Sequence, residues 1–377
     1  MLSMLRVAII SGPQYDGVGE LLSSFTAASG IDVDVAFRGD HGKLNRHLAE
    51  ALRSGPHYDL VSTHSKYAPS QAEHLLDLTG RVDLAGMADH AVELCRFAGR
   101  QLCVPRNIDA RLLWGRRHLL KGMPLPDSWE SVRATARKAL APFALPGTGS
   151  GLFGTFFELV VSHGGELFGT ELDPHFDGDA AIDALEWLRG MKGELPPDVE
   201  RWGYDEVAAG LREGSASFAG DWPAYFAELR AAVPDEDLVV GPYPRGPARR
   251  AVYSGCHAYA IPSDAPHAPE AAALLAHLVG PASARHEAER GMLPARADVP
   301  LPASDELSVR RTDLLARSVA EDMITFPPLR HYPEIEDAAW PAVQAAMVGR
   351  VPVQQAAAEM QRIAMAAVAA EREASRA

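Results

Sequence analysis

Short apolar runs and amphipathic segments alternate through the first third of the chain. The pattern predicts a strand at 5–10, a helix at 19–29, a strand at 31–37, a helix at 43–54 and a strand at 58–63. Gly30 and Gly55 follow the two helices, where glycine commonly ends a helix. Strands that alternate with helices predict a parallel sheet with right-handed crossovers.

The rest of the chain is mostly helical in its pattern. Amphipathic or apolar helices are predicted at 128–140, 154–165, 179–191, 204–214, 223–233, 269–280 and 280–291, and three more follow residue 304. Two further strands are predicted, a short one at 215–220 and a longer one at 253–262.

A hairpin is predicted at 93–105, around Ala98-Gly99-Arg100. A three-residue turn centred on Gly99 would place Cys95 opposite Cys103, whereas a two-residue turn at Ala98-Gly99 would place Cys95 opposite Leu102 and prevent a disulfide. In an oxidising compartment we expect Cys95 and Cys103 to be the pair that oxidises. Cys256 is expected to remain unpaired.

Composition narrows the classes of partner. The chain is 47% hydrophobic and 23% charged, which is typical of a soluble protein, and its 377 residues suggest two domains. The formal net charge is −14. The acidic balance argues against a nucleic-acid or anionic-membrane surface. No apolar run approaches the roughly 20 residues of a membrane span. The N-terminus lacks a basic leader, so the sequence as written indicates a cytoplasmic protein, and a removed or mis-started export signal would place it outside the cytoplasm.

Three sequence features suggest catalysis or cofactors, and each has a simpler interpretation. Three cysteines form no disulfide framework and match no zinc spacing, so no metal or cofactor is expected. Gly149, Gly151 and Gly154 spell G-x-G-x-x-G without the strand that a dinucleotide site needs. Cys256 and His257 are adjacent, so on a strand they face opposite sides and cannot act as nucleophile and base.

Six stretches in the correct order resemble the extracellular solute-binding proteins (family 1, maltose- and sugar-binding branch) of ABC importers, over roughly residues 5–365. They are "FTAASGIDVDV", "ALRSGPHYDLVST", "AGRQLCVPRNIDARLLWGRRHLL", "PLPDSWESV", "LREGSASFAGDWP" and "SGCHAYAIPSDAPHAPEAAALLAHLVGPASARHEAERGMLPAR".

The resemblance implies an α/β fold of the two-lobe, periplasmic-binding-protein-like type II class, each lobe being a mixed sheet flanked by helices. The expected N-terminal lobe is 1–106 with 256–300, and the expected C-terminal lobe is 107–255 with 301–377. The expected hinge crossings lie near 105–110, 250–256 and 298–312. The chain would be a monomeric binding protein without catalysis that closes on its ligand by hinge motion and docks on ABC permease subunits if exported.

Candidate ligand-binding residues come first from the loops after the three predicted strands, because ligands of open α/β sheets bind beyond the carboxyl ends of strands. These are Gly12, Pro13, Tyr15, Asp40, His41, Thr63 and His64. Ordinary surface loops are the alternative interpretation.

The resemblance adds candidates at the expected crossings and in the second lobe. These are Asn107, Asp109, Gly151, Phe153, Trp222, Tyr253, Gly255 and His257. Trp222, in "FAGDWPAYF", would stack against a sugar ring, or it is a core residue at a helix start. Asp109 would bind ligand hydroxyls, or it pairs with Arg106 or Arg111.

The expected ligand is a saccharide or polyol. A small carboxylate, a polyamine or another polar metabolite is the alternative, and so is a cytoplasmic ligand sensor or enzyme with the same fold.

Overall fold

The computed structural model describes residues 4–55 and 57–374. The chain divides into two compact units, each assembled from distant segments. Unit 1 comprises Met1–Asp109, Gly255–Pro302 and Pro328–Arg330, and unit 2 comprises Ala110–Ser254, Ala303–Pro327 and His331–Ala377.

The boundaries between the units differ from the expected ones. Residues 107–109, 255, 301–302 and 328–330 were expected in the second lobe, and the structure places them in unit 1. At the first boundary the reason is strand pairing: β6 (Val104–Ile108) continues past Arg106 and pairs with β12 (Cys256–Ala260).

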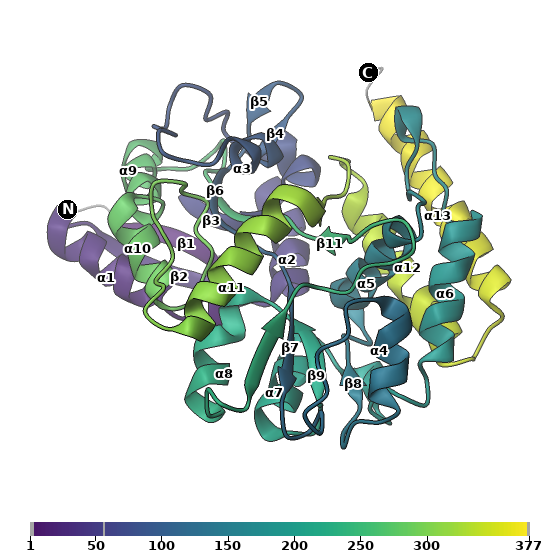
Figure 1. Ribbon diagram of the computed structural model, residues 1–377. Helices are drawn as coiled ribbons and strands as arrows, with labels where there is room; N and C mark the ends of the chain where they lie inside the picture. Colours follow the sequence, from purple (N-terminus) through teal and green to yellow (C-terminus); the bar gives the residue numbers. More distant parts are fainter. Residues whose placement is uncertain (1–3, 56, 375–377) are drawn as a thin grey trace. The chain divides into compact units, whose positions relative to one another are not determined.

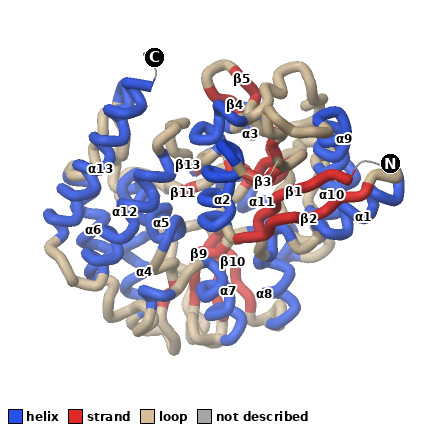
Figure 2. Tube along the Cα trace, turned by 180° about the vertical axis from the view of Figure 1, so that it is seen from behind, coloured by secondary structure: helices blue, strands red, loops and turns tan. Residues whose placement is uncertain are grey.

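Unit 1 contains a five-stranded sheet in the order β2-β1-β3-β12-β6. Strand β1 is parallel to β2 and β3, and β12 is antiparallel to β3 and β6. Besides β6 and β12, the elements of unit 1 are β1 (Met4–Ile10), α1 (Val18–Ser29), β2 (Asp32–Gly39), α2 (His41–Ser54), β3 (Leu60–His64), α3 (Asp89–Leu94), β4 (Arg96–Phe97), β5 (Arg100–Gln101), α9 (Ala268–Leu278) and α10 (Pro281–Glu289). Figure 2 shows β1 and β2 running side by side, as their pairing requires.

Helix α1 illustrates how apolar spacing forms the core of unit 1. Leu21, Leu22 and Phe25 are buried, whereas the intervening serines are exposed. The helix ends at Gly30 with a φ of 72°, a left-handed conformation that favours glycine. In Figure 1, α1, α9 and α10 lie together, and α1 packs on α9.

Unit 2 contains a four-stranded sheet in the order β10-β7-β9-β8. Its elements are β7 (Leu112–Arg116), α4 (Trp129–Ala136), β8 (Phe143–Ala144), α5 (Gly149–Ser162), α6 (Asp179–Gly190), α7 (Tyr204–Glu213), β9 (Phe218–Asp221), α8 (Phe226–Ala232), β10 (Leu238–Gly241), β11 (Val252–Tyr253), α11 (Glu306–Arg317), β13 (Met323–Ile324), α12 (Tyr332–Met347) and α13 (Val353–Ala374). Helix α5 is apolar on nearly all sides and is buried, with α6 and α12 packed against it (Figure 1).

Three local predictions differ from the structure. The strand expected at 253–262 is two strands, β11 in unit 2 and β12 in unit 1, separated at Ser254 and Gly255. The helix expected at 154–165 begins at Gly149, so the glycine-rich stretch forms its first turns. The helix expected at 43–54 begins at His41 because the Asp40 side chain accepts a hydrogen bond from the Lys43 N–H (2.8 Å) and caps it.

The hairpin adopts the two-residue turn. Ala98 and Gly99 both have positive φ (49° and 76°), and the Leu102 N–H donates to the Cys95 carbonyl (3.1 Å). The register that opposes Cys95 to Cys103 is therefore wrong. All three cysteines are free and buried.

Candidate functional site

Unit 1 gathers polar side chains at one edge of its sheet. Strands β1, β2, β3 and β6 run in one direction, so their carboxyl ends meet at this edge, and antiparallel β12 begins there. The side chains involved are Tyr15 after β1, His41 after β2, His64 in β3, Asn107 and Asp109 at the end of β6, and His257 in β12. All six were expected individually as ligand-binding residues.

His257 lies at the centre of this cluster and is only 2% exposed. Its Nε2 is 2.9 Å from Asp109 Oδ2, and its Nδ1 is 3.3 Å from the Tyr15 hydroxyl. The rings of His41 and His64 have centroids 4.6 Å and 5.3 Å from that of His257. Asp109 therefore pairs with a histidine, whereas Arg106 and Arg111 pair with Glu287 and Glu158.

The two other imidazoles are neutral near pH 7. Burial lowers the pKa of His41 and of His64 well below the ordinary value, and the neighbouring His257 lowers each further. His64 is paired with His257 in the β3–β12 register, and its Nδ1 accepts a hydrogen bond from the Lys66 N–H (3.2 Å).

A buried ion pair that the sequence did not indicate contacts the cluster through Tyr15. Arg106 donates to Glu287 (2.6 Å), both side chains being almost fully buried, and also donates to the Gln14 carbonyl. Its guanidinium lies 4.1 Å from the ring centre of Tyr15. Burial raises the pKa of Tyr15 to about 12, so its hydroxyl remains protonated. Arg106 thus fixes both the loop after β1 and the tyrosine.

The absence of a side chain at Gly255 leaves room for the His64 ring. A Cβ at Gly255 would lie 2.3 Å from His64 Cε1 and 2.9 Å from the Ser65 hydroxyl. No other residue fits there while His64 keeps its position.

Four expected ligand-binding residues of unit 1 have structural roles instead: Gly12, Pro13, Asp40 and Thr63. Asp40 caps α2 and pairs with Lys43 (3.1 Å). The buried Thr63 hydroxyl donates to Gln71 (3.0 Å). Gly12 has a φ of 121° and precedes Pro13, which begins a single turn ending at Tyr15.

In unit 2, a second buried ion pair positions aromatic side chains. Arg111 precedes β7, and its Nε donates to Glu158 of α5 (3.2 Å). Glu158 Oε1 accepts from the Tyr253 N–H (2.8 Å), and the Arg111 guanidinium lies 4.5 Å from the Trp222 ring centre. Burial raises the pKa of Glu158, and the Arg111 charge opposes that rise.

Trp222 is half-buried directly after β9, in the "GDWP" turn. Its ring is perpendicular to that of Tyr204, with centroids 4.5 Å apart. The backbone N–H of Trp222 donates to the buried carboxyl of Asp221 (2.9 Å), and burial raises the pKa of Asp221 to about 7. Trp222 is therefore neither a fully buried core residue nor a free surface side chain.

Gly151 and Phe153 are packing residues in this structure. A Cβ at Gly151 would lie 2.6 Å from Pro146. Phe153 is fully buried and stacks on Phe176 and Phe326. The expected ligand contact of Phe153 is not supported by this burial. Tyr253, 8% exposed, packs on Phe157 and Phe326.

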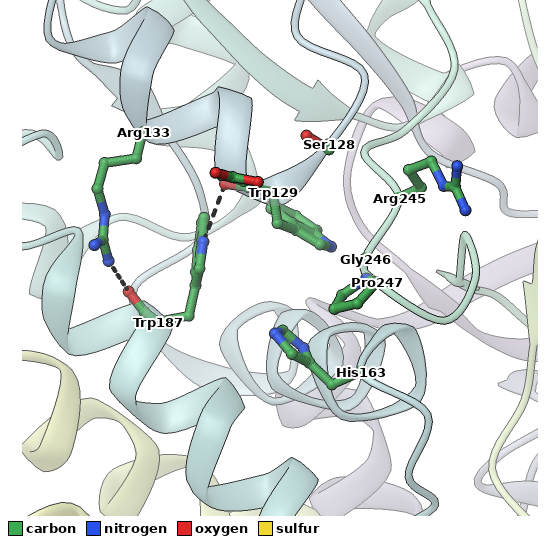
Figure 3. A pocket seen from close by; sticks show the side chains of 9 residues that line it. Ser128, Trp129, Arg133, His163, Trp187, Arg245, Gly246 and Pro247 are labelled. Atoms are coloured by element: carbon green, nitrogen blue, oxygen red, sulfur yellow. Dashed lines mark hydrogen bonds between the residues drawn. The ribbon is translucent and has the colours of Figure 1, made fainter.

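A surface pocket of about 450 Å³ lies elsewhere in unit 2 (Figure 3). Its lining includes Trp129, Trp187, His163 and Arg245, and the Trp187 indole donates to the Trp129 carbonyl (3.0 Å). His163 caps the carboxyl end of α5, whereas Gly149 begins that helix, so about 20 Å separates this pocket from the glycine-rich start. None of the residues expected at the site lines this pocket.

Two α/β units with chain crossings between them, each carrying buried polar groups at a sheet edge, define the class of two-lobe α/β binding proteins. Residues 15–285 match the family described as bacterial extracellular solute-binding protein, and this chain belongs to that family. A search of curated proteins gives no match.

Solved structures share the fold over nearly the whole chain. Maltose-bound MalE3 of T. maritima matches with a TM-score of 0.87 and 21% identity, covering 96% of this chain and 99% of that one. A solute-binding protein of Agrobacterium radiobacter K84 in complex with ribitol matches with a TM-score of 0.83 and 19% identity, covering 96% and 98%. The maltotriose-binding protein of Thermus thermophilus matches with a TM-score of 0.81 and 17% identity, covering 97% and 100%.

Proposed function

We propose that the protein binds a saccharide or polyol, without catalysing a reaction on it, as the solute-binding component of an ABC-type importer on the outer side of the cytoplasmic membrane. The family supports the class of function, since it is one of extracellular solute-binding proteins. Among the described residues, no helix is long and apolar enough to cross a membrane.

The half-buried Trp222 is the observation that carries the choice of a sugar or polyol. Sugar rings present apolar C–H faces that pack on an aromatic plane, while hydroxyl groups bind fixed polar atoms. Arg111 and Tyr204 hold the indole in one orientation. A ring held in advance loses little conformational entropy when ligand binds.

The ligands of the structural relatives agree with this choice. The relatives from T. maritima, A. radiobacter and T. thermophilus were solved with maltose, ribitol and maltotriose. Hydroxyl-rich, uncharged molecules are common to all three.

The side chains also support a binding protein without a Cys–His nucleophile. The Cys256 sulfur lies 4.0 Å from the Ala91 carbonyl, whereas His257 on the next position pairs with Asp109. The thiol and the imidazole therefore have different partners, and a nucleophile needs its base within hydrogen-bond reach.

A thermal-shift screen tests the proposal. The panel contains maltose, maltotriose, tagatose, ribitol, amino acids, polyamines and small dicarboxylates. A ligand that binds only the folded chain raises the melting temperature by mass action. We expect at least one sugar or polyol to raise it and the charged compounds to leave it unchanged. A shift confined to amino acids, polyamines or dicarboxylates would overturn the ligand class. Fractionation of the source cells tests the location, with recovery outside the cytoplasm as the expected result.

A further inference from the structure

We propose that unit 1 binds a divalent transition-metal ion, best matched by zinc, through His64, Asp109 and His257. The ligand atoms of these three side chains all lie within 4.8 Å of one another. The inference goes beyond solute binding, because every residue involved belongs to unit 1 and no solute is required.

The spacing of the three groups suits a single ion. Zinc lies about 2.0–2.2 Å from nitrogen and oxygen ligands, so two ligand atoms of one ion are roughly 3–3.5 Å apart in a tetrahedral site. His257 Nε2 and Asp109 Oδ2 are 2.9 Å apart. The His64 ligand atom lies within 4.8 Å of the other two, so an ion between them would require the three side chains to draw closer by rotation.

The outer contacts leave the required ligand atoms facing the site. The Tyr15 hydroxyl lies at Nδ1 of His257 (3.3 Å), and Nε2 of the same ring faces Asp109 Oδ2 (2.9 Å). The Asn107 amide donates to Asp109 Oδ1 (3.2 Å), so a metal ion would take the place of the proton between Nε2 and Oδ2. A hydrogen bond to the non-ligating atom of a histidine or carboxylate is the usual way in which proteins orient metal ligands.

The donor set selects the kind of ion. Imidazole nitrogen together with one carboxylate suits zinc and its neighbours in the first transition row, whereas magnesium and calcium prefer oxygen ligands alone. His41, whose ring centroid is 4.6 Å from that of His257 and 5.6 Å from that of His64, brings a third imidazole beside the three ligands.

A simple His–Asp ion pair accounts for less of the arrangement. It explains the contact of His257 with Asp109 but not the placing of two more imidazoles against His257. The same unit contains such a simple pair at the surface: His57 Nδ1 lies 2.6 Å from Asp264 Oδ2, with both side chains more than half exposed. This pair provides a matched control.

The experiment measures zinc binding by the chelator-treated full chain, with zinc alone and no solute, in competition with a chromophoric chelator. We expect one site per chain, and at least a tenfold loss of affinity in His257→Gln and in His64→Gln. The control His57→Gln should bind zinc as the wild type does. Zinc should also raise the melting temperature of the wild type and not that of His257→Gln.

Equal zinc affinity in the wild type, His257→Gln and His64→Gln would overturn the proposal, and so would an equal loss in His57→Gln. Circular dichroism without metal verifies that each variant folds. If neither site variant folds, cobalt replaces zinc in the wild type: visible absorption bands of a four-coordinate ion support the site, and their absence overturns it. Because sugar plays no part in these measurements, their failure leaves the proposed solute binding untouched.

Discussion

Arg111 determines how unit 2 presents its aromatic side chains, although the residue itself is 1% exposed. A buried guanidinium without a partner would be strongly destabilising, and Glu158 supplies the opposite charge. The pair then positions the Trp222 ring through Arg111 and the Tyr253 backbone through Glu158. Trp222 was identifiable from its sequence because a large aromatic beside a Gly-Asp turn is unusual. The ion pair was not, because its members lie in different elements without a local pattern.

Replacing Trp222 by alanine should weaken binding of the best sugar or polyol from the screen by about 1–3 kcal/mol, the range of aromatic hot spots. Calorimetric titration gives the dissociation constants. Trp222→Phe serves as the control, because it keeps an aromatic face and should lose less. Unchanged affinity together with a large fall in melting temperature would make Trp222 a residue of the core.

The buried carboxyl of Asp221 should make stability depend on pH. Its pKa is raised from 3.8 to about 7, so between these values the folded chain holds a proton that the unfolded chain releases, and stability falls as pH rises. Asp221→Asn keeps the acceptor for the Trp222 N–H and removes the titration. The variant should therefore gain stability over wild type between pH 5 and pH 8 by at most about 3 kcal/mol, because only about two pKa units of the shift fall in this range, at about 1.4 kcal/mol each. Urea unfolding at both pH values measures it, and an equal difference at both would contradict the assignment.

At the scale of elements, the pattern of apolar positions predicted most strands and helices of unit 1, because parallel strands and amphipathic helices have distinct periods. It did not separate β11 from β12, since the apolar run continues through Ser254 and Gly255. The break follows from a change of partners, because β11 pairs with β13 in unit 2, whereas β12 pairs with β3 and β6 in unit 1. The residues of the proposed metal site were expected only as separate ligand contacts, because β3, β6 and β12 come together only in the folded sheet.

Gly255→Ala should destabilise the chain by about 1–3 kcal/mol, the usual cost of overpacking, because its Cβ would meet His64 at 2.3 Å. Gly19→Ala is the matched control: it lies in α1 with nothing within 4 Å of the added Cβ, so it should be neutral or slightly stabilising. Denaturant unfolding compares the two variants. Equal effects would show that Gly255 is not constrained by His64.

The hairpin register bears on the cysteines. Cys95, Cys103 and Cys256 are at most 1% exposed, and burial, followed by the neighbouring thiols, raises the pKa of Cys95 well above its usual range. A thiol reagent should therefore react slowly with the folded chain and titrate all three cysteines in denaturant. Rapid reaction of the thiols in the folded chain would contradict their burial.

At the scale of the whole molecule, two units assembled from alternating segments give the solute-binding family its fold, and the family was recognisable from six short stretches in order. Those stretches contain strands and helices together with their turns and caps, which the fold requires whatever the ligand. The exact division of the chain and the buried ion pairs depend on long-range packing, and for that reason the sequence indicated them less well.

The central claim is that the chain binds a hydroxyl-rich, uncharged solute and leaves it unaltered. Isothermal titration calorimetry of the purified chain with each sugar and polyol of the screen, followed by chromatography of the recovered solute, tests it most directly. We predict saturable binding of one molecule per chain by at least one sugar or polyol, which is recovered chemically unchanged. Saturable binding of only charged metabolites, or conversion of the bound sugar into a product, would contradict the account.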